Sequence, residues 1–149
     1  MQLKTISKTI NIYAPKEKVW EVLINDEYNT QWYEAFSEGT HADTDWEVGS
    51  KAIFSDSSNN GIVGKIIVND PFEALAIQYE GMLKDGKEDY ESQLANDVKG
   101  SLEVYKLTVE DGVTQLDIAC DMGEDYYFQM SEDWDKALRK IKQIAEGLS

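Results

Sequence analysis

The sequence predicts an α+β domain in which an antiparallel sheet is covered by a long C-terminal helix. Between Phe36 and Met122, dipeptides typical of tight hairpin turns separate runs in which polar and apolar residues alternate. After Met122, apolar residues recur at steps of three and four up to Leu148, as on one face of a helix. The chain has 149 residues, a common size for one unit, so we expect residues 1–149 to form a single domain.

The N-terminal third predicts one strand and two short helices. Ile6, Ile10 and Ile12 lie at even positions, and polar residues lie at the odd positions between them. This alternation indicates a half-buried strand. Proline is favoured at the first helical position, so the range 15–23 is predicted as a helix. A second helix is expected near Asp26, because Tyr28 and Trp32 are four residues apart and share a face.

Six further strands are expected between the turn signals. They lie near residues 40–45, 51–56, 61–68, 72–82, 101–109 and 113–122. The predicted tight turns are Asn60-Gly61, Asp85-Gly86 and Asp111-Gly112. Between Lys84 and Gly100, charged residues dominate and the alternation of polar and apolar residues stops. This segment is predicted to be a surface loop with a helical turn around residues 90–95.

The alternation and the helical spacing also predict which faces are buried. One strand should bury Leu75, Ile77 and Tyr79, and a later one Leu116, Ile118, Cys120 and Met122. The final helix should face the sheet with Tyr127, Met130, Trp134, Leu138, Ile141, Ala145 and Leu148. We therefore expect the final helix to cover one face of the sheet and the other face to be exposed to solvent.

Composition excludes several classes of partner and compartment. The chain has 29 acidic and 14 basic residues and a formal net charge of −15, so it should repel nucleic acid and anionic membrane surfaces. Cys120 is the only cysteine, which excludes an intrachain disulfide. A signal peptide and a membrane-length apolar run are also absent. A cytoplasmic location is expected.

The predicted order of elements, together with three stretches, resembles a known family. The stretches are APKEKVW at 14–20, GKIIVNDPFEAL at 64–75 and WDKAL at 134–138. The chain looks like a helix-grip protein of the START-like (SRPBCC) superfamily, within the family of homologues of the activator of the heat-shock-protein-ninety ATPase. This resemblance implies a curved antiparallel sheet of about seven strands, two short helices after the first strand, and a long C-terminal helix packed across the sheet.

The resemblance implies several activities. The eukaryotic activator that gives the family its name also has a separate N-terminal domain, whereas this sequence starts with the first predicted strand, so we expect no stimulation of the chaperone ATPase. Some members of the superfamily are cyclases or hydrolases that act on aromatic substrates. The fold itself often leaves an apolar cavity between sheet and helix.

Residues with metal-binding or catalytic potential give no complete constellation. His41 shares a strand face with Asp43 and Asp45, but a row along a strand is not a closed metal cage. The series Asp56, Ser58, Asn60 resembles half of a calcium loop, yet Ile67 stands where the bidentate Glu is required, so a hairpin turn explains it better. Cys120 is expected to be buried and inert. We predict no catalytic residue, no metal and no cofactor.

The aromatic residues carry the functional hypothesis. The leading one is a non-enzymatic binding domain with an aromatic-lined cavity for a small hydrophobic ligand. We expect the lining to include Trp32, Phe54, Tyr79, Tyr105, Met130 and Trp134, unless large rings fill the core completely. The alternative is a co-chaperone-like interaction module with an outer acidic face that includes Glu80, Glu103 and Asp117. A hydrolase or cyclase acting on an aromatic substrate is the third hypothesis.

Overall fold

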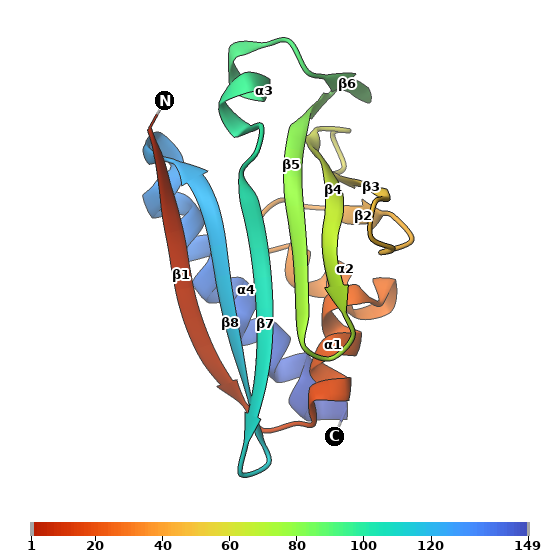
Figure 1. Ribbon diagram of the computed structural model, residues 1–149, viewed down its shortest axis with the longest axis vertical. Coiled ribbons are helices and arrows are strands. Elements are labelled where there is room, and N and C mark those ends of the chain that lie inside the picture. The colour runs from red at the N-terminus through yellow and green to blue at the C-terminus, as the bar shows by residue number, and fades with distance from the viewer. Residues whose placement is uncertain (1, 149) are drawn as a thin grey trace.

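The computed structural model describes residues 2–148, so the two ends of the predicted domain, Met1 and Ser149, lie outside the described residues. Figure 1 shows the arrangement of its elements. The strands are β1 (Leu3–Ile12), β2 (His41–Asp43), β3 (Lys51–Ser55), β4 (Gly61–Asp70), β5 (Ala74–Lys84), β6 (Lys87–Asp89), β7 (Leu102–Glu110) and β8 (Val113–Gly123). The helices are α1 (Lys16–Ile24), α2 (Asp26–Tyr33), α3 (Gln93–Val98), the 3₁₀ turn η1 (Glu124–Tyr126) and α4 (Tyr127–Leu148).

The sheet is antiparallel, and its order places the first strand, β1, beside the last strand, β8. The order is β1-β8-β7-β5-β4-β3-β2, and β6 pairs with β5 outside this path. β1 pairs with β8 over its whole length, from Leu3 opposite Gly123 to Ile12 opposite Thr114. The predicted antiparallel sheet of about seven strands is confirmed, with the short β6 as an eighth strand.

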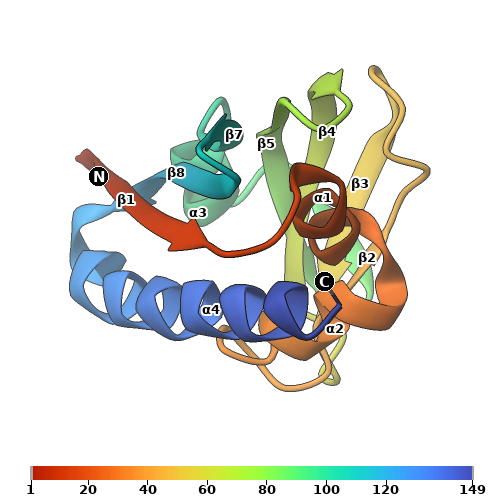
Figure 2. The same cartoon turned by 90° about the horizontal axis from the view of Figure 1, so that it is seen from below.

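The helices cover one face of this sheet, as Figure 2 shows from below. α4 packs on β1 and β8 and also contacts α1 and α2. Trp134, Leu138, Ile141 and Ala145 are buried, which confirms these members of the predicted apolar face. Tyr127, Met130 and Leu148 are only partly buried at the margins of the core. The long closing helix of the helix-grip fold is thus confirmed.

The alternation in the strands is confirmed as well. Leu75, Ile77 and Tyr79 are buried on β5, and Leu116, Ile118 and Cys120 are buried on β8, whereas Met122 is only partly buried. Their side chains meet those of α1, α2 and α4 in one continuous apolar core. Burying this apolar area from water is the main favourable contribution to folding.

Two local expectations need correction. The charged segment after Lys84 contains β6, which pairs with β5, and its helix α3 begins at Gln93, after Ser92 caps the Ala95 amide. The turn expected at Asn60-Gly61 lies one residue earlier, because Asn59 is the left-handed residue (φ 62°) and Gly61 already belongs to β4. The Asp85 and Asp111 turns have positive φ, as expected.

Candidate functional site

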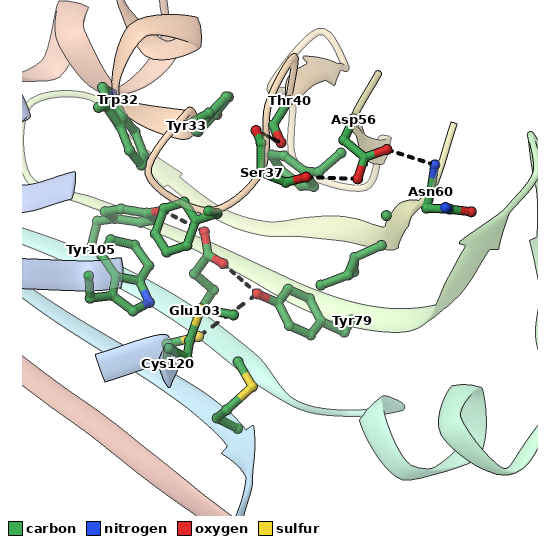
Figure 3. Close-up of a pocket in the computed structure, with 17 residues that line it drawn as sticks. Trp32, Tyr33, Ser37, Thr40, Asp56, Asn60, Tyr79, Glu103, Tyr105 and Cys120 are labelled. Carbon is green, nitrogen blue, oxygen red and sulfur yellow. Dashed lines mark hydrogen bonds between the residues drawn. The ribbon is translucent and has the colours of Figure 1, made fainter. Parts of the chain in front are cut away.

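A cavity of about 250 Å³ lies between the covered face of the sheet, α2 and the first half of α4. Figure 3 shows the side chains around it. The lining residues are Trp32, Tyr33, Phe36, Ser37, Thr40, Phe54, Asp56, Asn60, Gly61, Ile62, Tyr79, Glu103, Tyr105, Cys120, Met122, Met130 and Trp134. Most of the lining is apolar, and the polar groups gather at two places.

All six residues expected to line a pocket surround this cavity. They come from five elements: Trp32 from α2, Phe54 from β3, Tyr79 from β5, Tyr105 from β7, and Met130 and Trp134 from α4. The core is therefore not filled completely by these side chains. That a ligand contacts these six residues stays a prediction.

The aromatic wall of the cavity is a connected set of rings. Trp134 has its ring centroid 4.9 Å from that of Phe36, 5.9 Å from Tyr105 and 6.3 Å from Trp32. Tyr33 lies beside Trp32, with ring centroids 4.5 Å apart, and packs edge-on against Phe54 at 6.2 Å. Edge contacts of this kind orient rings relative to each other. The wall is therefore a continuous set of rings that orient one another.

Glu103 lies at the inner end of the cavity, which corrects its expected place on the outer acidic face. The Tyr79 hydroxyl donates a hydrogen bond to its Oε1, and the Tyr105 hydroxyl donates one to its Oε2 at 2.5 Å. Figure 3 shows the carboxylate between the two tyrosines. Glu103 and Tyr105 are two residues apart on β7, so their side chains share a face. The strand alternation that predicts Tyr105 on the pocket side of β7 therefore predicts the same side for Glu103.

Burial determines the protonation behaviour of this group of side chains. Desolvation raises the pKa of Glu103, and the hydrogen bonds from Tyr105 and Tyr79 oppose that rise. Desolvation also raises the pKa of Tyr79 and of Tyr105 well above the usual tyrosine value. Both phenols therefore stay protonated donors at neutral pH. The Glu103 carboxyl differs from the two phenols, because desolvation and its hydrogen bonds shift its pKa in opposite directions.

Cys120 lies beside Tyr79, with its Sγ 3.9 Å from the Tyr79 hydroxyl oxygen. It is 1% exposed, which confirms the expected burial. Desolvation is the largest cause that raises the pKa of its thiol, followed by the negative charge of Glu103. Because the thiolate is the nucleophilic form, a raised pKa makes this thiol unreactive.

The outer end of the cavity is polar and is organised by Asp56. Its Oδ1 accepts hydrogen bonds from the backbone amides of Ser58 and Asn60, and its Oδ2 accepts one from the Ser37 hydroxyl. These bonds lower the pKa of Asp56. Since the carboxylate caps the turn after β3, the hairpin explanation of this stretch is confirmed. Asn60 is exposed, so the cavity meets solvent here.

Other candidate residues lie apart from this site. His41 is exposed on β2, where its Nδ1 lies 3.2 Å from the Gly39 carbonyl oxygen. Among residues 2–148, no three His, Cys, Asp or Glu side chains gather as metal ligands. Asp117 accepts a hydrogen bond from Thr9 across the β1–β8 pair, and Glu80 is exposed. In the part of the chain described, no helix is long and apolar enough to cross a membrane.

Comparison with known proteins gives a family and a set of structural neighbours. A family model described as Activator of Hsp90 ATPase homolog 1-like protein matches residues 13–146. None of the curated proteins matches the sequence. Protein MLL2253 from Mesorhizobium loti has a TM-score of 0.77 at 16% identity, over 98% of this chain and 99% of that chain.

Two other solved structures have the same architecture. The Aha1 dimer from Colwellia psychrerythraea has a TM-score of 0.71 at 17% identity, over 96% of both chains. CalU16 from Micromonospora echinospora has a TM-score of 0.68 at 17% identity, over 96% of this chain and 76% of that chain. At these identities the likeness shows a shared fold.

Proposed function

The chain belongs to the family of Activator of Hsp90 ATPase homolog 1-like proteins, and from this premise we propose that it is a binding domain for a small, mainly apolar ligand. The ligand occupies the cavity between the sheet, α2 and α4. Contacts come from Trp32, Phe54, Tyr79, Tyr105, Met130 and Trp134. The function is non-enzymatic.

The observation that carries this proposal is the cavity of about 250 Å³ inside a core whose other residues are closely packed. Protein interiors rarely keep voids larger than a water molecule, because each void forfeits dispersion contacts. This cavity is open to solvent at its outer end, so its apolar lining stays in contact with water unless a ligand covers it. Apolar walls with a few convergent polar groups are typical of small-molecule sites.

The chemistry of the lining favours binding over catalysis. A nucleophilic cysteine needs a lowered pKa, whereas burial raises the pKa of Cys120. Glu103 has the raised pKa of a general acid, but Asp56, the other carboxylate of the lining, lies at the opposite end of the cavity. A hydrolase or cyclase acting through Glu103 is the enzymatic alternative. Turnover of an aromatic substrate that is lost in Glu103→Gln would favour it.

The family description suggests a chaperone as a second kind of partner. Glu80 is the exposed carboxylate of the three expected on an acidic outer face, since Glu103 lies in the cavity and Asp117 is bonded to Thr9. Salt-sensitive stimulation of a chaperone ATPase, reduced by Glu80→Gln, would favour this alternative.

Ligand binding is tested by calorimetric titration of the protein with the neutral probes propylbenzene and naphthalene. We expect saturable binding by the parent and its loss in Met130→Trp, because a larger ring from α4 enters the cavity that Met130 lines. The matched control is Lys136→Trp on the exposed face of α4, which should bind as the parent does. Failure of the parent to bind either probe, or equal binding by Met130→Trp when it melts like the parent, would refute the pocket.

A further inference from the structure

The charges that line the cavity are of one sign. Of its 17 lining residues, Glu103 and Asp56 are acidic, and none is Lys, Arg or His. Glu103 forms no ion pair with any residue in the range 2–148. The two carboxylates lie at opposite ends, Glu103 inside and Asp56 at the mouth. The interior is therefore an apolar space that contains a carboxylate without a counter-ion.

The two carboxylates differ in how many of their acceptor sites are occupied. Asp56 accepts three hydrogen bonds, from Ser37, Ser58 and Asn60. Glu103 accepts two, one on each oxygen, from tyrosines that hold its orientation. A carboxylate offers about four acceptor sites, so about two remain on Glu103. A group that enters the cavity can fill them only as a donor.

Aromatic rings complete the surroundings of Glu103. Tyr105 bonds directly to the carboxylate, and its ring packs against Trp134 at 5.9 Å and Trp32 at 6.4 Å. The electron-rich faces of aromatic rings attract cations, most strongly where water is excluded. A carboxylate among such rings therefore favours a positive charge over a neutral group and disfavours a second anion.

Resting on the function proposed above, we infer that the ligand is a small arylalkyl amine, an aromatic ring with an amine on a short alkyl chain, whose protonated nitrogen pairs with Glu103. The aromatic ring lies against Trp32, Tyr105 and Trp134, and the ammonium donates to the free acceptor sites of the carboxylate. The cavity of about 250 Å³ suits a compound with one or two rings. Fatty acids and other anionic apolar compounds are excluded as ligands, because they bring a like charge to Glu103.

The test uses four probes with the same phenylethyl frame and different ends. They are phenethylamine, 2-phenylethanol, propylbenzene and 3-phenylpropanoate, titrated calorimetrically at neutral pH, where an alkyl amine is protonated. We expect phenethylamine to bind at least about tenfold more tightly than propylbenzene, as a charge-assisted hydrogen bond implies. The alcohol should fall between them, and the carboxylate should bind most weakly.

Two variants assign the preference to Glu103. Glu103→Gln keeps the side-chain shape and should bring the affinity for phenethylamine to within about twofold of the affinity of the same variant for propylbenzene. Glu80→Gln removes one negative charge from the neighbouring strand at an exposed position and should leave the preference intact. This control separates a direct contact from the attraction of the acidic protein as a whole.

A pH titration provides a measurement that needs no variant. Glu103 is faced by Tyr79 of β5, Tyr105 of β7, Cys120 of β8 and Tyr33 of α2, whose pKa values are all raised. Asp56 stays ionised because its pKa is lowered, and the residues of α4 that line the cavity, Met130 and Trp134, carry no charge. The affinity for phenethylamine should therefore fall as the pH drops through the raised pKa of Glu103, and the affinity for propylbenzene should not.

The outcomes separate the inference from the function on which it rests. Propylbenzene binding with no amine preference, or a preference that survives in Glu103→Gln, overturns the inference and leaves the pocket standing. If Glu103→Gln does not fold, Tyr79→Phe takes its place. It removes a donor that stabilises the carboxylate, so it should move the pH midpoint of amine binding upward, and an unmoved midpoint overturns the inference. Binding of none of the four probes overturns the pocket itself.

Discussion

The indole nitrogen of Trp32 donates a hydrogen bond to the carbonyl oxygen of Val22 at 2.8 Å, which ties the aromatic wall of the cavity to the end of α1. The last four carbonyl groups of a helix have no partner within the helix, and Val22 is among these in α1. Trp32 is 2% exposed, so this bond is shielded from water. The same side chain thus supports the packing of α1 against α2 and forms the cavity.

Trp32→Phe should therefore cost more than the loss of ring area alone. The variant leaves a buried carbonyl without a donor, which adds about 1–3 kcal/mol of destabilisation. Urea denaturation measures the difference. The control is Trp46→Phe, because the indole nitrogen of Trp46 donates no hydrogen bond within the part of the chain described. Equal losses in the two variants would show that the bond to Val22 contributes nothing.

The sequence predicts the fold well in strands where apolar residues alternate with polar ones, because that alternation marks the buried face. Leu75, Ile77 and Tyr79 repeat every second residue because one face of β5 is buried. The strand β6 has no such pattern, since it is three residues long and mostly exposed on both faces. Its pairing with β5 depends on the hairpin at Asp85 and not on its own composition. Short exposed strands of this kind leave no periodic signal.

The sequence predicts the aromatic residues of the cavity lining well, but it predicts the position of the Glu103 carboxylate poorly. Large apolar side chains on buried faces must meet in the core, so Trp32, Tyr105 and Trp134 follow from periodicity. Glu103 breaks the general rule that carboxylates face solvent. The sequence signal for its position is the two-residue spacing from Tyr105, which places both side chains on the covered face of β7. Glu103 is half-buried, and the hydroxyl groups that bond its carboxylate come from β5 as well as β7, whose pairing is not visible in one sequence.

Gly61 should be essential for the hairpin at the mouth of the cavity. A Cβ atom at this position would lie 1.7 Å from the Phe54 carbonyl oxygen, so the backbone of β3 has to shift. We expect Gly61→Ala to destabilise the fold by about 3 kcal/mol, at the upper end of overpacking effects. Gly147→Ala is the control, because nothing lies within 4 Å of a Cβ there and alanine favours a helix. Parallel thermal melts with equal midpoints would contradict the close contact.

Trp134→Ala should show how far α4 holds the fold together. Trp134 is 2% exposed, as its place on the apolar face predicts, and it packs against Phe36, Tyr105 and Trp32. Loss of the ring should cost about 3–5 kcal/mol and should also change the affinity for propylbenzene by enlarging the cavity. Lys136→Ala on the exposed face should stay within about 0.5 kcal/mol of the parent. A Trp134→Ala protein as stable as the parent would contradict the packing of α4 on the sheet.

Glu103 should make the free energy of unfolding depend on pH in a direction opposite to that of most paired carboxylates. Burial raises its pKa in the folded protein, so the folded state holds this proton to a higher pH than the unfolded chain does. The resulting stability is fully present below the unfolded value of about 4.3 and is lost as the pH rises through the raised folded value. The ionised carboxylate in the unliganded protein is therefore destabilising.

Glu103→Gln should remove this dependence. The amide keeps an acceptor for one tyrosine and donates to the hydroxyl oxygen of the other, so the variant should equal or exceed the parent in stability at neutral pH. Its advantage should shrink as the pH falls towards about 4, where the parent carboxyl is protonated. Urea denaturation of both proteins between about pH 4 and pH 8 gives the difference, and Glu80→Gln shows the effect of an exposed carboxylate at the same pH values. A parent that exceeds Glu103→Gln in stability at neutral pH and loses that lead in acid would mean that the carboxylate is stabilised in the fold and that its pKa is lowered.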